Sequence, residues 1–316
     1  MSPPVQPEAS ADPNSQTHRS TDRSSRRVSL SDRAFFVCLS IISGTYVLLI
    51  VAMLAADAWY VAEKTIDAAA GKGHSLSALF LENPIAEALA DRRIRYSIWL
   101  SLISCSLSAV LSLVVAVPMG YLLSRHNFFG KRLLDAVLDI PIVLPPLVVG
   151  LSLLILFQFA PLAFVAGRVV HQIPAVVLAQ FSVACAFAVR TMKSTFDHIT
   201  PRCEHVAISL GCTRAQAFGM VVLPDASRGM LTALTLAWAR SLGEFGPLLV
   251  FAGMTRMKTE VLSMTVYLEL SVGNIEAAVA VSLIMVVAAV TVLIVARRFG
   301  AHLEEAETTA DARHRS

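Results

Sequence analysis

Six apolar runs constrain this chain more than any other feature of its sequence. They cover roughly residues 34–56, 97–123, 140–160, 173–190, 228–252 and 274–296. Each is close to the ~20 residues that an α-helix needs to cross ~30 Å of hydrocarbon. Helices are expected, because backbone polar groups in lipid must be hydrogen-bonded within their own segment. The sequence therefore predicts an all-α membrane protein with six transmembrane helices.

Composition agrees with a fold that lies in lipid. Of 316 residues, 55% are hydrophobic and 16% are charged, whereas ordinary soluble domains carry about 25% charged residues. The net charge of +3 is too small to indicate nucleic-acid binding. The five cysteines show no CxxC spacing, so neither a disulfide framework nor a metal site is expected.

The distribution of Lys and Arg predicts that both termini lie in the cytoplasm. Segments that this arrangement places inside carry more basic residues than those outside, as the positive-inside rule requires. The main exception is the outer cluster Arg92, Arg93 and Arg95. With six spans, residues 190–227 form a cytoplasmic loop. The expected location is the cell (inner) membrane, with multiple passes.

Five parts follow one another along the predicted chain. They are a disordered cytoplasmic tail (1–33), a first transmembrane helix (34–56), a periplasmic or extracellular segment (57–94), a five-helix core (95–298) and a cytoplasmic tail (299–316). The first part is rich in Ser, Pro, Asp and Arg, and such a composition cannot bury enough apolar surface to fold.

The loop 190–227 has the pattern of two short helices, at 203–210 and 213–220, separated by Gly211. Pro224 is expected to end the second helix, because proline lacks a backbone donor. Two short helices joined by glycine form a knob that fits a cleft of another protein. Leu210 and Phe218 would offer it apolar contact, and Glu204 and Arg214 charge. The alternative is a plain surface loop with amphipathic turns.

This loop resembles the EAA signature of ABC-importer permeases. Gly211 is followed by nine residues and then by Val221-Val222-Leu223-Pro224, as in that signature. The usual first Glu falls on His205, with Glu204 one place earlier, and Arg228 stands where many relatives carry Pro. The resemblance assigns contact with the partner ATPase to Glu204, His205, Ala207, Leu210, Gly211, Arg214, Phe218, Leu223 and Pro224.

The resemblance implies the architecture and the partners of type I ABC importers. These partners are a cytoplasmic ABC ATPase in two copies, an extracytoplasmic solute-binding protein and a second copy of this chain. The sequence itself contains no GxxxxGK[ST] phosphate-binding loop. ATP and Mg²⁺ are therefore expected at the partner ATPase, and we expect no catalytic residue and no cofactor in this chain.

The run 228–252 contains two charged residues, Arg240 and Glu244, four positions apart on one helix face. A charge at mid-bilayer costs about 2.5–3.5 kcal/mol on insertion scales. The two are expected either to form an internal ion pair that locks helices or to belong to a gate. Gly243, Gly246 and Pro247 would allow close packing and a bend there.

The run 140–160 begins with Pro141 and continues through Pro145-Pro146 to Gly150. Adjacent prolines free backbone carbonyls, which neighbouring helices or cavity water must satisfy. A simple helix kink is the alternative to a role in transport. The candidate pore and gate residues are Arg240, Ser241, Gly243, Glu244, Gly246, Pro145, Pro146 and Gly150.

The Pro-Pro-x-Val-x-Gly start and the Leu-Gly-Glu-Phe-Gly run resemble the molybdate, tungstate and sulfate branch of these permeases. That branch implies a tetrahedral oxyanion, with molybdate or tungstate ranked before sulfate. Ser241, Thr232, Thr235 and Ser263 could donate hydrogen bonds to it, or could bond to their own helix carbonyls instead.

The predicted function is the permease subunit of an ATP-driven oxyanion importer. Relatives for ferric iron, thiamine and polyamines share the loop, so these solutes remain alternatives. An ion-coupled secondary transporter that uses Glu244 for protons is a further alternative. A membrane enzyme is disfavoured, because the sequence contains neither HExxH nor GxSxG.

Overall fold

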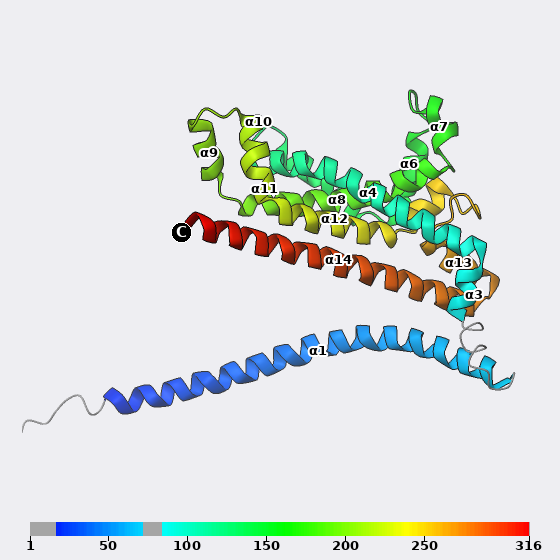
Figure 1. Ribbon diagram of the computed structural model, residues 1–316, viewed down its shortest axis with the longest axis horizontal. Coiled ribbons are helices and arrows are strands. Elements are labelled where there is room, and N and C mark those ends of the chain that lie inside the picture. The colour runs from blue at the N-terminus through cyan, green and yellow to red at the C-terminus, as the bar shows by residue number, and fades with distance from the viewer. Residues whose placement is uncertain (1–16, 72–83, 316) are drawn as a thin grey trace, which may run out of the picture. The chain divides into compact units, whose positions relative to one another are not determined.

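The computed structural model describes residues 17–71 and 84–315, and all regular elements among them are helices (Figure 1). The chain divides into two units, residues 1–60 and 61–316, which are described separately. The all-α prediction is confirmed for the described residues.

Helix α1, Thr17–Gly71, carries the first apolar run. Its stretch Phe35–Lys64 is long and apolar enough to cross a membrane. The prediction of a disordered tail over 1–33 differs from the structure, in which residues 17–33 belong to α1; residues 1–16 lie outside the described residues. No Gly or Pro occurs between Thr17 and Ser43. An existing helix can extend through such a segment without a new nucleus.

The 61–316 unit is built around three helices that pack on one another: α4 (Arg92–Arg125), α8 (Ile173–His198) and α12 (Ser227–Leu242). The buried face of α4 consists largely of small residues, and five of them are serines: Ser97, Ser101, Ser104, Ser108 and Ser112. Small side chains allow helix backbones to approach closely, which is how helices associate where lipid removes the hydrophobic driving force.

The flanking helices are α3 (Pro84–Ala90), α13 (Leu262–Val272) and α14 (Ile275–Arg315). Helix α14 packs on α12 and α13 and continues to Arg315, into the segment predicted as a separate tail at 299–316; residue 316 lies outside the described residues. Part of the predicted outer segment 57–94 is likewise helical, in α1 and α3, while residues 72–83 lie outside the described residues.

Six uninterrupted spans are not confirmed. Among the described residues, four helices are long and apolar enough to cross a membrane, within α1, α4, α8 and α14. The third predicted span is a pair, α5 (Lys131–Val143) and α6 (Pro146–Leu156), bent by 113°. The fifth ends early, because α12 stops at Leu242 and a π-helical turn, η3 (Leu248–Ala252), follows. Both breaks coincide with the Pro and Gly residues of these runs.

The loop 190–227 contains two short helices, as predicted. They are α9 (Pro201–Ser209) and α10 (Arg214–Ala217), and the π-helical turn η2 (Phe218–Val222) and α11 (Leu223–Asp225) lead into α12. Helix α10 is shorter than expected, and Pro224 lies inside α11 rather than ending a helix. Helix α7 (Ala163–Val169) connects α6 with α8.

Candidate functional site

The two interrupted spans meet at their breaks. A Cβ added to Gly150 would lie 2.7 Å from Pro247 Cα, and one added to Gly246 would lie 2.7 Å from Pro146 Cβ. The start of α6 and the start of η3 thus pack on each other, with Gly150 against Pro247 and Gly246 against Pro146. The sequence-predicted residues Pro146, Gly150 and Gly246 are therefore brought together, although 96 positions separate the two glycines.

Arg240 and Glu244 form the expected ion pair, with Arg240 Nη1 2.6 Å from Glu244 Oε1. The side chain of Glu244 is 1% exposed, whereas that of Arg240 is 30% exposed. The guanidinium of Arg240 also lies over the ring of Phe187 on α8, 5.5 Å from its centroid. The guanidinium of Arg240 is therefore a partly exposed cation next to α8, and the carboxylate of Glu244 that pairs with it is buried.

The four candidate hydroxyl donors behave in two ways. Thr232 and Thr235 donate to carbonyls of their own helix, at Arg228 and Leu231. Ser241 Oγ donates to Ser108 Oγ at 3.3 Å, and Ser263 Oγ donates to the carbonyl of Glu244 at 2.7 Å. Own-helix bonding is thus confirmed for the two threonines, while the two serines join separate elements.

Glu204 faces inward, which corrects the expectation that its charge is offered to a partner. It is buried, Tyr121 Oη donates to its Oε1 at 2.5 Å, and Arg125 Nε lies 3.9 Å from its Oε2. Arg125 also donates to the carbonyl of Ile199. A buried carboxylate requires such partners, because desolvation otherwise costs several kcal/mol. Glu204 therefore anchors α9 to the end of α4.

Phe218 also faces inward rather than offering apolar contact. Its ring lies 4.7 Å from that of Tyr121 and 6.4 Å from that of Phe196, measured between centroids. Ala207 is buried and Leu223 is half-buried. Edge-to-face rings of this kind stabilise a junction beyond their buried area. The base of the loop is thus an aromatic and ionic junction with α4 and α8.

The tip of the loop is exposed and partly apolar. Leu210 is 82% exposed, and His205, Gly211, Arg214 and Pro224 are exposed as well. Two apolar residues that sequence reasoning missed join them, Val206 and Met220. A helical projection of 201–209 places Val206 opposite Glu204, so it identifies Val206 only once Glu204 is known to face inward. An apolar tip on an anchored base suits contact with another protein.

A second group of charges that the sequence did not reveal connects α5 with α8. Arg190 donates to both carboxylate oxygens of Asp139, and Lys193 donates to Asp135 at 2.6 Å. Asp135 and Asp139 are four positions apart on α5, so both face α8. The spacing of four between Asp135 and Asp139 is visible in the sequence and could have indicated this group.

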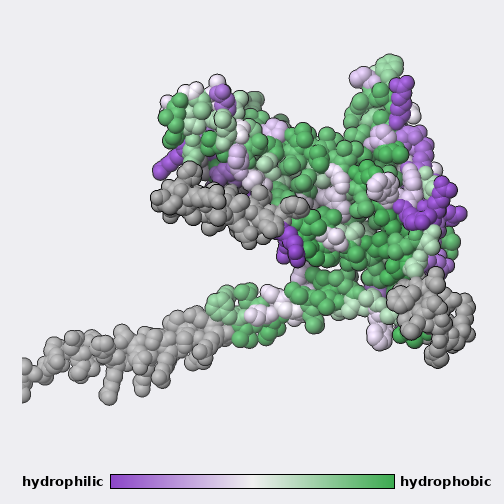
Figure 2. All heavy atoms as spheres, in the orientation of Figure 1, coloured by the Kyte–Doolittle hydropathy of each residue, from purple (hydrophilic) through white to green (hydrophobic). Residues whose placement is uncertain are grey.

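Hydrophobic residues dominate the visible face of the 61–316 unit between the α9–α11 end and the opposite end, where hydrophilic residues gather (Figure 2). This distribution is the one expected for a protein with a lipid-facing belt.

The family described as "Binding-protein-dependent transport system inner membrane component" matches residues 112–305 of this chain. The chain belongs to this family. This permease is 33% identical over 200 residues to the sulfate transport system permease protein CysT of Salmonella typhimurium, covering 61% of this chain and 72% of that protein. It is 34% identical over 201 residues to the probable molybdenum ABC transporter permease protein of Haloferax volcanii, covering 63% and 73%.

A third relative of the permease is the molybdate/tungstate transport system permease protein WtpB of Pyrococcus abyssi, 35% identical over 152 residues, which cover 48% of this chain and 58% of that protein. The resemblance to the molybdate, tungstate and sulfate branch is thus confirmed. The structure of a bacterial ABC transporter involved in the import of alginate matches with a TM-score of 0.59 at 15% identity, covering 81% of this chain and 95% of that one. That likeness supports the fold.

Gly211 gives a first test of the loop. It has φ +96° with nothing within 4 Å of an added Cβ, so Gly211→Val would act through backbone strain of about 1–3 kcal/mol. We expect the permease to fold but to lose about fivefold or more in affinity for a partner ABC ATPase, since about 1.4 kcal/mol corresponds to tenfold. Pull-down with the ATPase measures this. Gly219→Val is the control, since Gly219 also has open space and lacks a positive φ. Uptake and ATPase association both unchanged in Gly211→Val would refute the expectation.

Proposed function

We propose that this permease forms the translocation path of an ATP-driven importer for a tetrahedral oxyanion. The observation that carries the proposal is the loop between α8 and α12, whose apolar tip is exposed while its base is fixed to α4 by Glu204. Because its base is fixed to α4, a displacement of the loop by a partner would be passed on to the transmembrane helices.

The loop would sit in a surface groove of a cytoplasmic ABC ATPase, present in two copies. His205, Val206, Leu210, Arg214 and Met220 would make the contact, because they are exposed. ATP and Mg²⁺ would be bound by that partner, and this chain would bind no cofactor and carry no catalytic residue. Closure of the ATPases would move α9, and the permease would turn from inward- to outward-facing.

The membrane topology of the proposal has six spans and both termini in the cytoplasm. The bent pair α5–α6 would count as one span, and α12 with η3 as another. Residues 1–33 and 299–316 would be cytoplasmic, and residues 57–94 would lie outside. The family's importers imply a second copy of this chain, with the path between the two copies. An external binding protein would deliver the solute.

The relatives do not separate the candidate oxyanions. Sulfate and molybdenum permeases are equally similar to this chain, at 33% and 34% identity, so the ranking of molybdate or tungstate first stays a prediction. Arg240 supports an anionic solute, since it is a partly exposed cation within an apolar run. Ferric iron, a cation, would be disfavoured by it, and so would cationic thiamine and polyamines.

The test is purification in mild detergent from native membranes, with mass spectrometry of what accompanies the permease. We expect a stoichiometric ATPase with a phosphate-binding loop, whose hydrolysis rises when binding protein and sulfate, molybdate or tungstate are added. A permease that emerges alone, under conditions that preserve known complexes, would contradict the proposal. Uptake driven by a pH gradient without ATP would then favour an ion-coupled transporter.

A further inference from the structure

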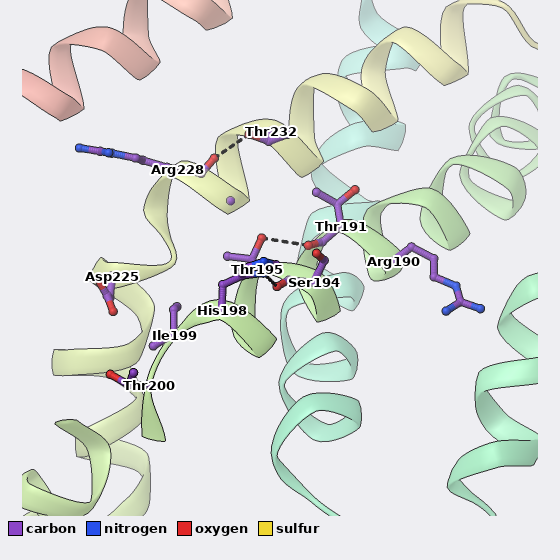
Figure 3. A pocket seen from close by; sticks show the side chains of 11 residues that line it. Arg190, Thr191, Ser194, Thr195, His198, Ile199, Thr200, Asp225, Arg228 and Thr232 are labelled. Carbon is purple, nitrogen blue, oxygen red and sulfur yellow. Dashed lines mark hydrogen bonds between the residues drawn. The ribbon is translucent and has the colours of Figure 1, made fainter. Parts of the chain in front are cut away.

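An open cavity of about 850 Å³ lies between α8 and the start of α12 (Figure 3). Its lining includes the polar or charged residues Arg190, Ser194, Thr195, His198, Arg228 and Thr232. In the topology proposed above, this cavity opens in the cytoplasmic half of the permease. It is therefore placed where a solute would leave.

One face of α8 leads into this cavity. Phe187, Arg190, Ser194 and His198 follow one another at spacings of three and four residues, which places them on the same side of a helix. A face with this polarity is costly against lipid and normally borders water or other protein. The face begins under Arg240, whose guanidinium covers the ring of Phe187.

The cations on this face are the strongest candidates for anion contact. The hydroxyls of Thr191, Thr195 and Thr232 donate to carbonyls of their own helices. A guanidinium offers five donors in a fixed fork that suits oxyanions. Arg240, on α12 over the ring of Phe187, and Arg190, three residues further along α8, thus supply two guanidinium groups.

Arg240 is paired with Glu244, whereas Arg190 is paired with Asp139 and its Nη1 also lies 3.7 Å from Asp135 Oδ1. The nearest carboxylates of the two arginines differ in accessibility. Glu244, beside Arg240, has a side chain that is 1% exposed. Asp139, beside Arg190, has a side chain that is 37% exposed, and Arg190 itself is 40% exposed. Figure 3 shows the Arg190 side chain extending away from Arg228 and the other labelled residues, so its guanidinium is directed away from the centre of the cavity that its residue lines. Because this side chain is 40% exposed, an anion that leaves the cavity can reach the guanidinium and compete with Asp139.

We infer that Arg190 is an exit station for the oxyanion, with Asp139 as the counter-ion that the solute displaces and that afterwards returns. This inference rests on the proposed function. Exchange between two anions on one guanidinium keeps the solute weakly bound, which a transport path requires for release. Asp135 and Lys193 hold α5 beside α8, so that the Asp139 carboxylate stays close while it is displaced.

A purely structural clasp between α5 and α8 makes a different prediction from an exit station. If the pair only fastens the helices, Arg190→Gln and Asp139→Asn should impair transport alike, since each breaks the same contact. If Arg190 is an exit station, the two changes act in opposite directions on the anion. Arg190→Gln removes the station, whereas Asp139→Asn removes the nearer of its two carboxylate competitors, leaving Asp135 at 3.7 Å, and makes the station hold its anion more tightly.

The experiment uses the full permease with its ATPase and binding protein in proteoliposomes, with radiolabelled sulfate and molybdate as probes. Uptake is measured against increasing concentrations of the same oxyanion on the cytoplasmic side. We expect Asp139→Asn to be inhibited at an approximately tenfold lower cytoplasmic concentration, the effect of one charged hydrogen bond. Arg190→Gln should show slower uptake and weaker inhibition, and Arg190→Lys should retain part of both.

The matched control is the double variant Arg256→Gln/Glu269→Gln, which removes an ion pair of 3.4 Å remote from the cavity, and it should behave as wild type. Equal loss of uptake in Arg190→Gln and Asp139→Asn, without a change in inhibition, would overturn the inference and leave a clasp. Failure of the proposed function looks different, because the wild-type permease would then take up none of the oxyanions.

Discussion

Replacing Gly150 with alanine is expected to lower the thermal unfolding midpoint of the detergent-solubilised permease by about 5–10 °C. The added Cβ would lie 2.7 Å from Pro247 Cα and 2.9 Å from the Pro247 carbonyl oxygen. Both are backbone atoms, which cannot rotate away as a flexible side chain would. The two interrupted spans must therefore separate at their breaks.

Gly246→Ala should have a comparable effect, since its Cβ would meet Pro146 Cβ at 2.7 Å and Leu147 N at 2.9 Å. Gly167→Ala is the matched control. It lies in α7 with nothing within 4 Å of an added Cβ, and alanine favours a helix more than glycine does. An unfolding midpoint for Gly150→Ala equal to that of Gly167→Ala would show that the breaks do not pack as described.

Removing Glu204 by mutation to alanine is expected to detach α9 from α4. Tyr121 Oη would lose its acceptor and Arg125 its carboxylate, and breaking a buried charged contact costs about 3–5 kcal/mol. We expect backbone amides of α9 to exchange with deuterium at least about tenfold faster, because local opening becomes easier. Hydrogen exchange with mass spectrometry measures this without reference to transport. Glu204→Gln should exchange at an intermediate rate, since the amide oxygen still accepts from Tyr121 while Arg125 loses its carboxylate.

The neighbouring variant His205→Ala serves as the control for exchange, since His205 is exposed and outside this junction. A double-mutant cycle with Tyr121→Phe would isolate the contribution of the hydrogen bond. In the assembled importer, Glu204→Ala should also lower ATP-dependent uptake while ATPase binding persists, because the side chains of the tip are unchanged. Unchanged exchange in a folded Glu204→Ala permease would contradict the anchoring role.

The places where helices would break could be predicted from the sequence. Pro145 and Pro146 mark the bend between α5 and α6, and the segment from Gly243 to Pro247 marks the end of α12. Both follow from local chemistry, because proline lacks a donor and glycine weakens a helix wherever it occurs. That the two breaks pack on each other could not be predicted, since nothing local links Gly150 to Pro247.

The coupling loop shows the same limit at the level of single side chains. Its two helices and the turn at Gly211 are encoded within a few residues. The direction of Glu204 depends on Tyr121, 83 positions earlier. Counted from the signature alone, Glu204 and Phe218 belong to the contact with the partner. In the structure both are used to hold the loop, and Val206 and Met220 occupy the tip instead.

The sequence by itself determined that this permease is helical, that it lies in a membrane and where its helices are interrupted. The length of an apolar run and the effects of glycine and proline on a helix depend only on neighbouring residues. They can therefore be predicted from the sequence. Only the tertiary structure decided which charges are neutralised internally and which stay accessible. Arg240 and Arg190 look alike in the sequence, but one has a buried counter-ion and the other an exposed one. Burial depends on elements that come together from distant parts of the chain.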